Sequence, residues 1–338
     1  MAVRDLVLEI LKASQNHDGF VSGEELAERC KVTRASIWKA VENLRSRGIK
    51  IEAVTNKGYR LLEDNSFDAA SILRNVTDSE IKVYFYETID STLNEAKRLL
   101  ANGNVKAFHK NVIVAAEQTS GRGRLGRAFV SPQKSGIYIS LVYSSRPVTN
   151  PAIYTSSAAV GVCRALSKLF GVDAKIKWVN DIFVNGRKVC GILTEGVTNF
   201  ETGTIEAAVI GIGINIVNNP LLPQNVAGGI FESLNEKTEE KLQRSKLVAA
   251  VAEEIYSILD YGESGIKKSM QEYIDRSLLI GKQVVVSPII GQTENNYLCT
   301  VKGITENAEL LVTLSDGTEK ILQCGEVSIH SEKMCYNE

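Results

Sequence analysis

The sequence predicts an α+β protein of two or three domains. The chain has 338 residues, whereas a typical domain has roughly 150. Hydrophobic residues make up 44% and charged residues 23% of the chain, as is usual for folded globular proteins. Apolar residues follow helical spacing near the N-terminus, strands alternate with helices in the middle, and short strands recur from Lys282 onward. We therefore expect a helical N-terminal unit, a larger mixed unit and a small β-rich tail.

The N-terminal unit begins with short predicted helices. The first has its apolar residues on one helical face, at Val3, Leu6, Val7, Ile10 and Leu11. Residues 22–25 have the pattern of a capping box, in which a serine hydroxyl and a glutamate carboxylate accept from backbone N–H groups where a helix starts. This second helix ends near Cys30, and Thr33 can cap a third. Two short helices joined by a tight turn are typical of a helix-turn-helix.

A hairpin with alternating apolar residues follows, over 49–53 and 59–61, and completes a predicted winged helix. Residues 1–28 hold two basic and six acidic side chains (−4), whereas residues 29–60 hold nine basic and two acidic ones (+7). This local charge favours DNA binding. The expected contacts are Arg34, Ser36, Trp38, Lys39 and Asn43 of the third helix and Lys57 and Arg60 of the hairpin. A module that binds protein or only packs is the alternative, and Trp38 alone could be a packing residue.

Composition argues against several other classes of protein. The 39 Lys and Arg residues against 40 Asp and Glu residues leave a net charge of −1, so the chain as a whole has no basic field. Six cysteines are scattered without a C-x-x-C pair and only three histidines accompany them, which makes a zinc site improbable. There is no signal-peptide core and no spanning segment. We expect a reducing, cytoplasmic location and no membrane partner.

The middle of the chain contains a loop in which glycine and arginine alternate. An apolar strand over 112–116 leads into Glu117 to Arg127, where Gly121, Gly123 and Gly126 match G-x-G-x-x-G. The dinucleotide-binding interpretation fails, because Pro132 prevents a long helix and no acidic residue follows before Asp173. Instead, the glycines allow close backbone approach while guanidinium groups neutralise phosphate or carboxylate. The sequence therefore predicts an anion-binding loop, with a solvated basic loop as the alternative.

Asn185-Gly186 predicts a hairpin with a two-residue turn. Counting from this turn pairs Asp181 with Cys190 and Asn180 with Gly191. Asp181 and Lys188 then share a face as diagonal neighbours about 7–8 Å apart. A lysine near a carboxylate and an anion-binding loop can stabilise developing negative charge. An ordinary exposed ion pair is the alternative.

The remaining elements are a strand, a helix and the β-rich tail. Residues 204–215 form an apolar strand whose glycines, Gly211 and Gly213, predict close packing. Asn215 at its end could present an amide to a ligand. A long helix is predicted over 247–259, and Asp316-Gly317 marks a hairpin turn in a small β-barrel.

Together these motifs resemble those of biotin-protein ligases. The resemblance rests on Ser91-Thr92, Glu117 to Arg127, Lys177 to Asp181, Lys188 to Leu193 and Gly211 to Asn215. With its winged helix, the chain resembles the bifunctional bacterial type, which is also the biotin operon repressor. The resemblance covers essentially the whole chain. It implies a winged helix-turn-helix over 1–65, a class II synthetase-like catalytic domain with a central mixed β-sheet over 66–275, and an SH3-like β-barrel over 276–338.

The resemblance implies an ATP-dependent ligase. Biotin and Mg-ATP give biotinyl-5'-AMP and pyrophosphate, and the biotinyl group then passes to a lysine of a biotin carboxyl carrier protein of a carboxylase. Biotinyl-5'-AMP is also the expected corepressor, which promotes homodimerisation and binding to operator DNA. The alternatives are a ligand-sensing transcription factor without catalysis and a lipoate-protein ligase.

The resemblance also implies roles for particular residues. Lys188, Arg124 and Asp181 are the expected catalytic residues. Biotin is expected at Ser91, Thr92, Leu93, Gln118, Gly121, Arg122, Gly123, Arg124, Lys188 and Gly191. ATP and the adenylate are expected at Arg124, Arg127, Phe129, Asn180, Lys188 and Asn215. The resemblance places Asn180 and Asp181 near phosphate and magnesium as an expectation, but it assigns no metal ligand. Family members commonly have proline where Val179 stands, and often arginine and tryptophan where Leu125 and Phe129 stand.

Overall fold

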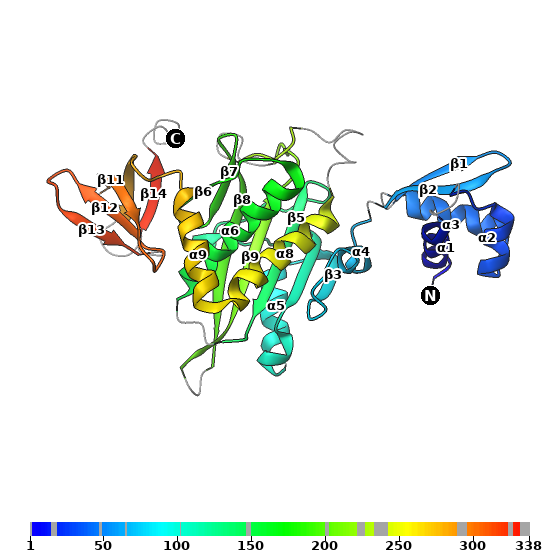
Figure 1. Ribbon diagram of the computed structural model, residues 1–338, viewed down its shortest axis with the longest axis horizontal. Coiled ribbons are helices and arrows are strands. Elements are labelled where there is room, and N and C mark those ends of the chain that lie inside the picture. The colour runs from blue at the N-terminus through cyan, green and yellow to red at the C-terminus, as the bar shows by residue number, and fades with distance from the viewer. Residues whose placement is uncertain are drawn as a thin grey trace.

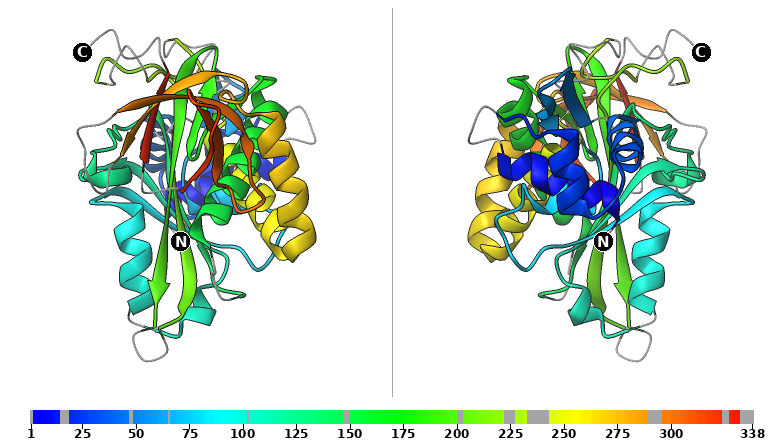
Figure 2. Two further views of the ribbon diagram at one scale, coloured as in Figure 1. Left: turned by 90° about the vertical axis from the view of Figure 1, so that its left-hand side faces the viewer. Right: turned by 90° about the vertical axis from the view of Figure 1, so that its right-hand side faces the viewer.

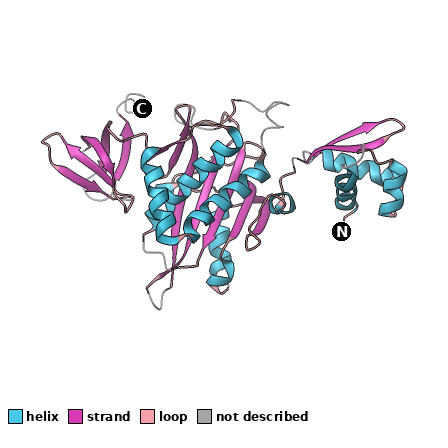
Figure 3. Cartoon of the chain, in the orientation of Figure 1, coloured by secondary structure: helices cyan, strands magenta, loops and turns pink. Residues whose placement is uncertain are grey.

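The computed structural model describes residues 2–14, 19–46, 49–64, 66–101, 103–146, 150–199, 203–221, 227–232, 243–288, 296–323 and 327–331. A helical unit with a hairpin lies at one end, a large sheet with helices in the middle and a small sheet at the other end (Figure 1). Helices gather on the central sheet and in the N-terminal unit, while the C-terminal part is drawn as strands (Figure 3). None of the described helices is long and apolar enough to cross a bilayer.

The N-terminal unit is the predicted winged helix. Its elements are α1 (Val3–Ala13), α2 (Gly23–Cys30), α3 (Arg34–Ser46), β1 (Ile49–Val54) and β2 (Gly58–Asp64). The Ser22 hydroxyl accepts from the Glu25 N–H at 3.0 Å, which confirms one half of the capping box. The Glu25 carboxylate accepts instead from Arg29 Nη1 at 3.2 Å, so the other half was wrong. A side chain one helical turn away offers this carboxylate a charged donor.

The central sheet is mixed and has seven strands in the order β3-β4-β5-β9-β8-β7-β6. The strands are β3 (Lys82–Ile89), β4 (Asn111–Gln118), β5 (Gly136–Tyr143), β6 (Lys175–Lys177), β7 (Asp181–Val184), β8 (Arg187–Thr198) and β9 (Ile205–Asn215). β3 and β4 run parallel, and the other neighbours run antiparallel.

Helices cover both faces of this sheet. They are α4 (Ala69–Leu73), α5 (Thr92–Ala101), α6 (Pro151–Phe170), α8 (Arg244–Asp260) and α9 (Gly262–Asp275), with short 3-10 turns η2 (Val105–Phe108) and η3 (Arg124–Gly126). Figure 2 shows α8 and α9 on one side of the sheet and α5 on the other. The two sides have separate hydrophobic clusters, so the sheet is buried on both faces.

The hairpin of β7 and β8 corrects the predicted register. Val184 pairs with Arg187 and Phe183 with Lys188, as counted from the turn, but Ile182 pairs with Cys190 and Asp181 with Gly191. The predicted pairs of Asp181 with Cys190 and of Asn180 with Gly191 were therefore wrong by one residue. The register shifts between Ile182 and Phe183, because a β-bulge places an extra residue in one strand.

The C-terminal strands are β10 (Gln283–Pro288), β11 (Tyr297–Ile304), β12 (Leu310–Leu314), β13 (Glu319–Leu322) and β14 (Val327–Ser331). They form an antiparallel sheet in the order β13-β12-β11-β10-β14. The predicted hairpin turn at Asp316-Gly317 is confirmed, with Gly317 at φ +84°. Buried residues of this sheet belong to the same hydrophobic cluster as the central domain, and Trp178 Nε1 donates to the Ala308 carbonyl at 2.8 Å.

Hydroxyl groups connect the segment after the winged helix to the central domain. The Ser245 hydroxyl in the first turn of α8 donates to the Ser66 carbonyl at 2.7 Å. It also lies 2.7 Å from the Ser71 hydroxyl of α4. Beside them, the Arg244 guanidinium stacks on the Phe67 ring, 4.5 Å from its centroid.

Candidate functional site

Most of the predicted ligand-binding residues gather at one end of the central sheet. The parallel strands β3 and β4 both end there, at Ile89 and Gln118. β5 and β9 bring Gly136 and Asn215 to the same end as a pair, and the start of β8 lies beside the end of β9. The chain therefore converges on this edge from segments that are far apart in sequence.

Thr92 and Gln118 form a largely buried polar network with Ser131 and Ser140, and Ser91 lies next to it in the chain. Ser91 and Thr92 are 1% and 3% exposed. The Thr92 N–H and hydroxyl donate to Gln118 Oε1 at 2.9 and 3.2 Å, and Gln118 Nε2 donates to the Ser131 hydroxyl at 2.9 Å. The Ser140 hydroxyl donates to the Thr92 hydroxyl at 2.9 Å. Buried polar groups paired in this way hold one geometry, so this end of the site is ordered before any ligand arrives.

The glycine-arginine loop has one arginine turned toward the hairpin. Arg124 Nη1 donates to Asn180 Oδ1 at 3.0 Å, and the side chains of Arg122 and Arg127 are exposed. The Gly123 N–H donates to the Arg127 carbonyl at 2.8 Å, which closes the loop on itself. As expected, no helix follows the glycines before β5, and the 3-10 turn η3 lies within the loop itself.

The predicted approach of Asp181 and Lys188 is confirmed. Lys188 Nζ lies 2.7 Å from Asp181 Oδ1, with side chains 29% and 22% exposed. That oxygen is buried and makes no aligned hydrogen bond within the described part of the chain, so the contact is an ion pair. Asn180 Nδ2 donates to the Ile192 carbonyl at 3.0 Å. Two cations from separate segments, Arg124 and Lys188, thus contact adjacent residues, Asn180 in the turn before β7 and Asp181 at the start of β7.

Three glycines of β8 and β9 lie on the side of the sheet that faces Phe129, Lys188 and Leu93. A Cβ added to Gly213 would lie 2.3 Å from Phe129 Cε1, and one on Gly191 would lie 3.4 Å from the same ring and 3.7 Å from Lys188 Nζ. At Gly211 a Cβ would lie 2.8 Å from Leu93 Cδ1. The predicted close packing at Gly211 and Gly213 is confirmed, and the Phe129 ring lies directly over Gly213.

Tyr138 supports Phe129 from the side, with ring centroids 6.4 Å apart. Burial raises the pKa of Tyr138 to about 12, so its hydroxyl stays protonated and donates to the Pro132 carbonyl at 2.9 Å. Asn215 is 6% exposed, and its carbonyl accepts from the Ile230 N–H at 3.2 Å. The segment around residue 230 therefore packs against the same end of the sheet.

The winged helix exposes most of the predicted DNA-contacting side chains. Arg34, Lys39, Asn43 and Lys57 are exposed, and Trp38 is 57% exposed, so Trp38 does not pack in the core of the module. Ser36 and Arg60 are less available. The Ser36 hydroxyl lies 3.0 Å from the Thr33 hydroxyl. Arg60 pairs with Glu52 at 2.6 Å, and its guanidinium lies 4.5 Å from the centroid of the Phe20 ring.

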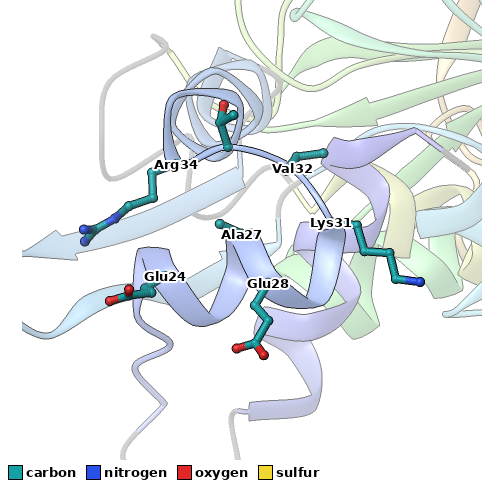
Figure 4. A pocket seen from close by; sticks show the side chains of 7 residues that line it. Glu24, Ala27, Glu28, Lys31, Val32 and Arg34 are labelled. Atoms are coloured by element: carbon teal, nitrogen blue, oxygen red, sulfur yellow. The ribbon is translucent and has the colours of Figure 1, made fainter.

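A shallow depression beside the turn of the helix-turn-helix is lined by Glu24, Ala27, Glu28, Lys31, Val32, Thr33 and Arg34. Lys31 and Arg34 extend away from each other there, while Glu24 and Glu28 project from α2 (Figure 4). Sequence reasoning did not single out Lys31. It has a left-handed backbone at φ +54° and ends α2, and its side chain is exposed.

Two families match the chain at the places where these features lie. A helix-turn-helix (HTH) domain family matches residues 6–60, and the biotin/lipoate A/B protein ligase family matches residues 75–215. The bifunctional ligase/repressor BirA of Bacillus subtilis is 31% identical over 316 residues, which are 91% of this chain and 94% of that protein. The bifunctional ligase/repressor BirA of Escherichia coli is 30% identical over 92% of this chain and 94% of its own length.

This chain belongs to the bifunctional ligase/repressor family. A solved structure agrees on the fold: the biotin protein ligase from Aquifex aeolicus, in complex with biotin and ATP, superposes with a TM-score of 0.57 at 23% identity. The superposition covers 74% of this chain and 99% of the Aquifex protein.

Sequence reasoning missed two hydroxyl groups of this bifunctional ligase/repressor. Ser131 and Ser140, 4% and 0% exposed, join the network around Thr92 and Gln118. Ser140 lies in the middle of an apolar strand, and a buried polar residue on such a strand is a signal that could have found it. Ser131 follows Phe129 in a loop, and nothing in its local sequence distinguishes it.

The Asp181 carboxylate suits a metal ion that is bound together with a nucleotide. Among the described residues, no cluster of His, Cys, Asp and Glu side chains is large enough to hold a metal ion. Magnesium, however, is commonly held by one or two carboxylates together with substrate phosphates. Asp181, with a buried carboxylate oxygen beside Lys188, can supply one such ligand.

Proposed function

We propose that this protein joins biotin to AMP, transfers the biotinyl group to a carrier-protein lysine, and represses transcription from operator DNA. The convergence of Arg124 and Lys188 on Asn180 and Asp181 supports the ligase activity most directly. An adenylating enzyme must bring a carboxylate and a triphosphate together, and both are anions. Arg124 and Lys188, two cations held close together, offset the repulsion between the carboxylate and the triphosphate.

Biotin lies between the polar network and the cations in this proposal. Its head group contacts Ser91, Thr92, Leu93 and Gln118, while its carboxylate reaches Lys188 near Gly191. Gly121, Arg122 and Gly123 close over the acid tail. The buried hydrogen bonds of Thr92 and Gln118 support this direction, because a paired donor-acceptor network recognises a polar ring better than an apolar one.

The nucleotide occupies the remaining cationic and aromatic side of the site. Arg124 and Arg127 contact the phosphates, Phe129 packs against the base, and Asn180 and Asn215 contribute amides. Magnesium enters with ATP, and Asp181 is the residue of this chain that would hold it. The bound ion supplies additional positive charge at the phosphates.

The first chemical step needs orientation and charge neutralisation and no nucleophile from the protein. A carboxylate oxygen of biotin attacks the α-phosphorus, and the bond from that phosphorus to the bridging oxygen breaks. Pyrophosphate leaves with the electron pair, and biotinyl-5'-AMP remains. Lys188 and Arg124 stabilise the charge that develops on the α-phosphate oxygens.

The second step transfers the biotinyl group to a carrier protein. The uncharged amine of the carrier lysine attacks the biotinyl carbonyl carbon, and the bond from that carbon to the phosphate oxygen breaks. AMP leaves with the electron pair, and the new amide releases one proton to solvent. The accepting partner is a biotin carboxyl carrier protein of a carboxylase.

Repression uses the N-terminal module. Biotinyl-5'-AMP acts as the corepressor and promotes homodimerisation, because paired winged helices suit operators with two half-sites. Exposed Trp38, Lys39 and Asn43 contact the DNA. We place the domain limits at 1–65, 66–275 and 276–338, with the last an SH3-like barrel. The cytoplasmic location stays a prediction.

The ligase proposal is tested by exchange of labelled pyrophosphate into ATP. Exchange that requires biotin is expected, and lipoate should not replace it. Arg124→Ala and Lys188→Ala should each lower the exchange rate about 10²–10³-fold. Arg187→Ala is the control, because Arg187 is adjacent to Lys188 but pairs with exposed Glu232. Exchange without biotin, or an equal loss in the Arg187 variant, would contradict the site assignment.

The repressor proposal is tested by operator binding and sedimentation with and without biotin plus ATP. Ligands should raise both DNA affinity and the fraction of dimer. Trp38→Ala should weaken DNA binding while pyrophosphate exchange stays unchanged. If ligands alter neither affinity nor assembly, the chain is a ligase whose winged helix has another partner.

A further inference from the structure

An ion-pair clamp lies just outside the buried polar network. Asp90 precedes Ser91, and Arg98 lies two turns into α5. Arg98 Nη2 and Nη1 donate to the two carboxylate oxygens of Asp90 at 2.7 and 3.0 Å. Asn94 Nδ2 adds a third hydrogen bond to the same carboxylate at 3.1 Å. A bidentate contact fixes the orientation of both groups as well as their distance.

Arg98 is itself held in place from the other side. Its Nε donates to Glu95 Oε2 at 2.6 Å, and Glu95 Oε1 accepts from the Tyr86 hydroxyl of β3 at 2.9 Å. The clamp therefore ties α5 to the strand that leads into it. The Arg98 guanidinium holds the pKa of the Asp90 carboxyl well below its usual range, which favours the charged form of this carboxyl.

The backbone of Asp90 reaches the glycine-arginine loop. The Asp90 carbonyl accepts from the Ser120 N–H at 2.8 Å, one residue before Gly121. The Ser91 carbonyl accepts from the Glu95 N–H at 3.0 Å. Asp90 thus binds α5 through its side chain and the glycine-arginine loop through its main chain.

We propose that Arg98, through its bidentate contact with Asp90, is a positioning residue for biotin. It sets the place of Ser91 and Thr92 relative to the glycine-arginine loop without touching the ligand. The inference rests on the proposed placement of biotin at Ser91 and Thr92. The side chains of Arg98 and Asp90 are 49% and 37% exposed, and exposed ion pairs contribute little to stability. The three hydrogen bonds that the Arg98 guanidinium donates to Asp90 and Glu95 therefore matter for geometry more than for folding.

The test measures KM for biotin, KM for ATP and kcat in the full-length enzyme. Arg98→Gln should raise KM for biotin about tenfold, because small displacements of contacting groups have large effects on ligand recognition. KM for ATP and kcat should change less than about twofold, and the thermal midpoint should not move. Arg98→Lys should recover part of the loss, since lysine keeps the positive charge but cannot make the bidentate contact with Asp90.

Lys97→Gln is the matched control. Lys97 is the preceding residue of α5 and pairs with Glu195 at 2.6 Å, with side chains 36% and 32% exposed, but it does not contact Asp90. We expect it to leave KM for biotin unchanged. An equal rise in both variants, or a rise in KM for ATP as large as that for biotin, would overturn the positioning role.

A double-mutant cycle separates the clamp from the site assignment. Asp90→Asn combined with Arg98→Gln should cost no more than either change alone, because the pair acts as a unit. Thr92→Val reports on biotin placement independently. If Thr92→Val leaves KM for biotin unchanged, the placement itself is wrong. If Thr92→Val raises it and Arg98→Gln does not, the placement stands and the clamp inference fails.

Discussion

The winged helix and the C-terminal sheet are both small units at the ends of the chain, yet they are attached in different ways. The winged helix has a hydrophobic cluster of its own. The C-terminal sheet shares one cluster with the central domain, and the indole of Trp178 is hydrogen-bonded into it. The comparison indicates that the DNA-binding unit can fold and move separately, whereas the C-terminal sheet is part of the structural support of the ligase.

Truncation is the strongest test of this difference. Deleting residues 283–338 removes part of a shared core, and we expect a loss comparable to the whole stability of a domain, about 5–15 kcal/mol. The product should be unfolded by circular dichroism. Deleting residues 1–65 should leave the melting midpoint of the remainder within about 2 °C, since a 1 kcal/mol change shifts it about 2–4 °C. Comparable midpoints for both truncations would refute the distinction.

A core substitution in the winged helix should damage that unit alone. Ile37 is 0% exposed, and Ile37→Ala should cost about 2–5 kcal/mol through the lost contacts and the cavity. Calorimetry should show the winged-helix transition at lower temperature and the central transition unmoved. Ile139 lies in β5 and is 1% exposed. Ile139→Ala should conversely lower the central transition and leave the winged-helix transition unmoved. A single transition that shifts in both variants would mean that the two cores are coupled.

The two tryptophans allow a smaller effect to be measured. Trp178→Phe removes the donor to the Ala308 carbonyl and leaves a buried acceptor unpaired, which should cost about 1–3 kcal/mol. Trp38→Phe, at a side chain 57% exposed, should change stability by less than about 0.5 kcal/mol. Urea titrations give both values. Equal costs would show that the contact between the sheets contributes nothing of its own.

The smallest expected effect is a loss of central-domain stability in mild acid. Burial lowers the pKa of His109, which faces Asp260, Lys110, Glu80 and Asp78. A lowered folded pKa means stability that is present above the unfolded value of about 6.5 and lost as pH falls. Protonation would also remove the acceptor for the Ser144 N–H, 3.3 Å from Nδ1.

We expect a loss of about 1 kcal/mol between pH 7 and pH 5. Fluorescence in a Trp38→Phe background measures it, because Trp178 then reports the central core alone. His109→Gln should flatten this dependence. A slope that persists in the His109 variant would assign the effect to other groups.

The winged helix was predictable from sequence because its signals are local. The apolar stripe of α1, the Ser22 cap and the turn before α3 each lie within a few residues of the structure they specify. The glycine-arginine loop was equally visible, since glycine and arginine alternate within Gly121 to Arg127. The approach of Asp181 and Lys188 was predicted from the hairpin turn, and it is present although the bulge changes the strand partner of Asp181 from Cys190 to Gly191.

Other features depend on packing that no local pattern records. Helix α6 was not predicted, because it is buried over most of its surface and lacks the amphipathic stripe on which such predictions depend. The bulge within the β7–β8 hairpin and the role of Ser140 depend on partners from other strands. Local chemistry therefore identified the groups at the site, and tertiary packing decided which of them touch.

The hydrogen bond between Ser66 and the first turn of α8 links the position of this helix to the segment that follows the winged helix. Ser245 lies in the first turn of α8 and donates a hydrogen bond to the Ser66 carbonyl, in the segment that follows the winged helix. α8 ends at Asp260, whose carboxylate pairs with Lys110 at 2.8 Å. Both ends of α8 are therefore tied to other segments of the chain. If α8 were displaced, the segment around Ser66 that leads from the winged helix into the central domain would move with it.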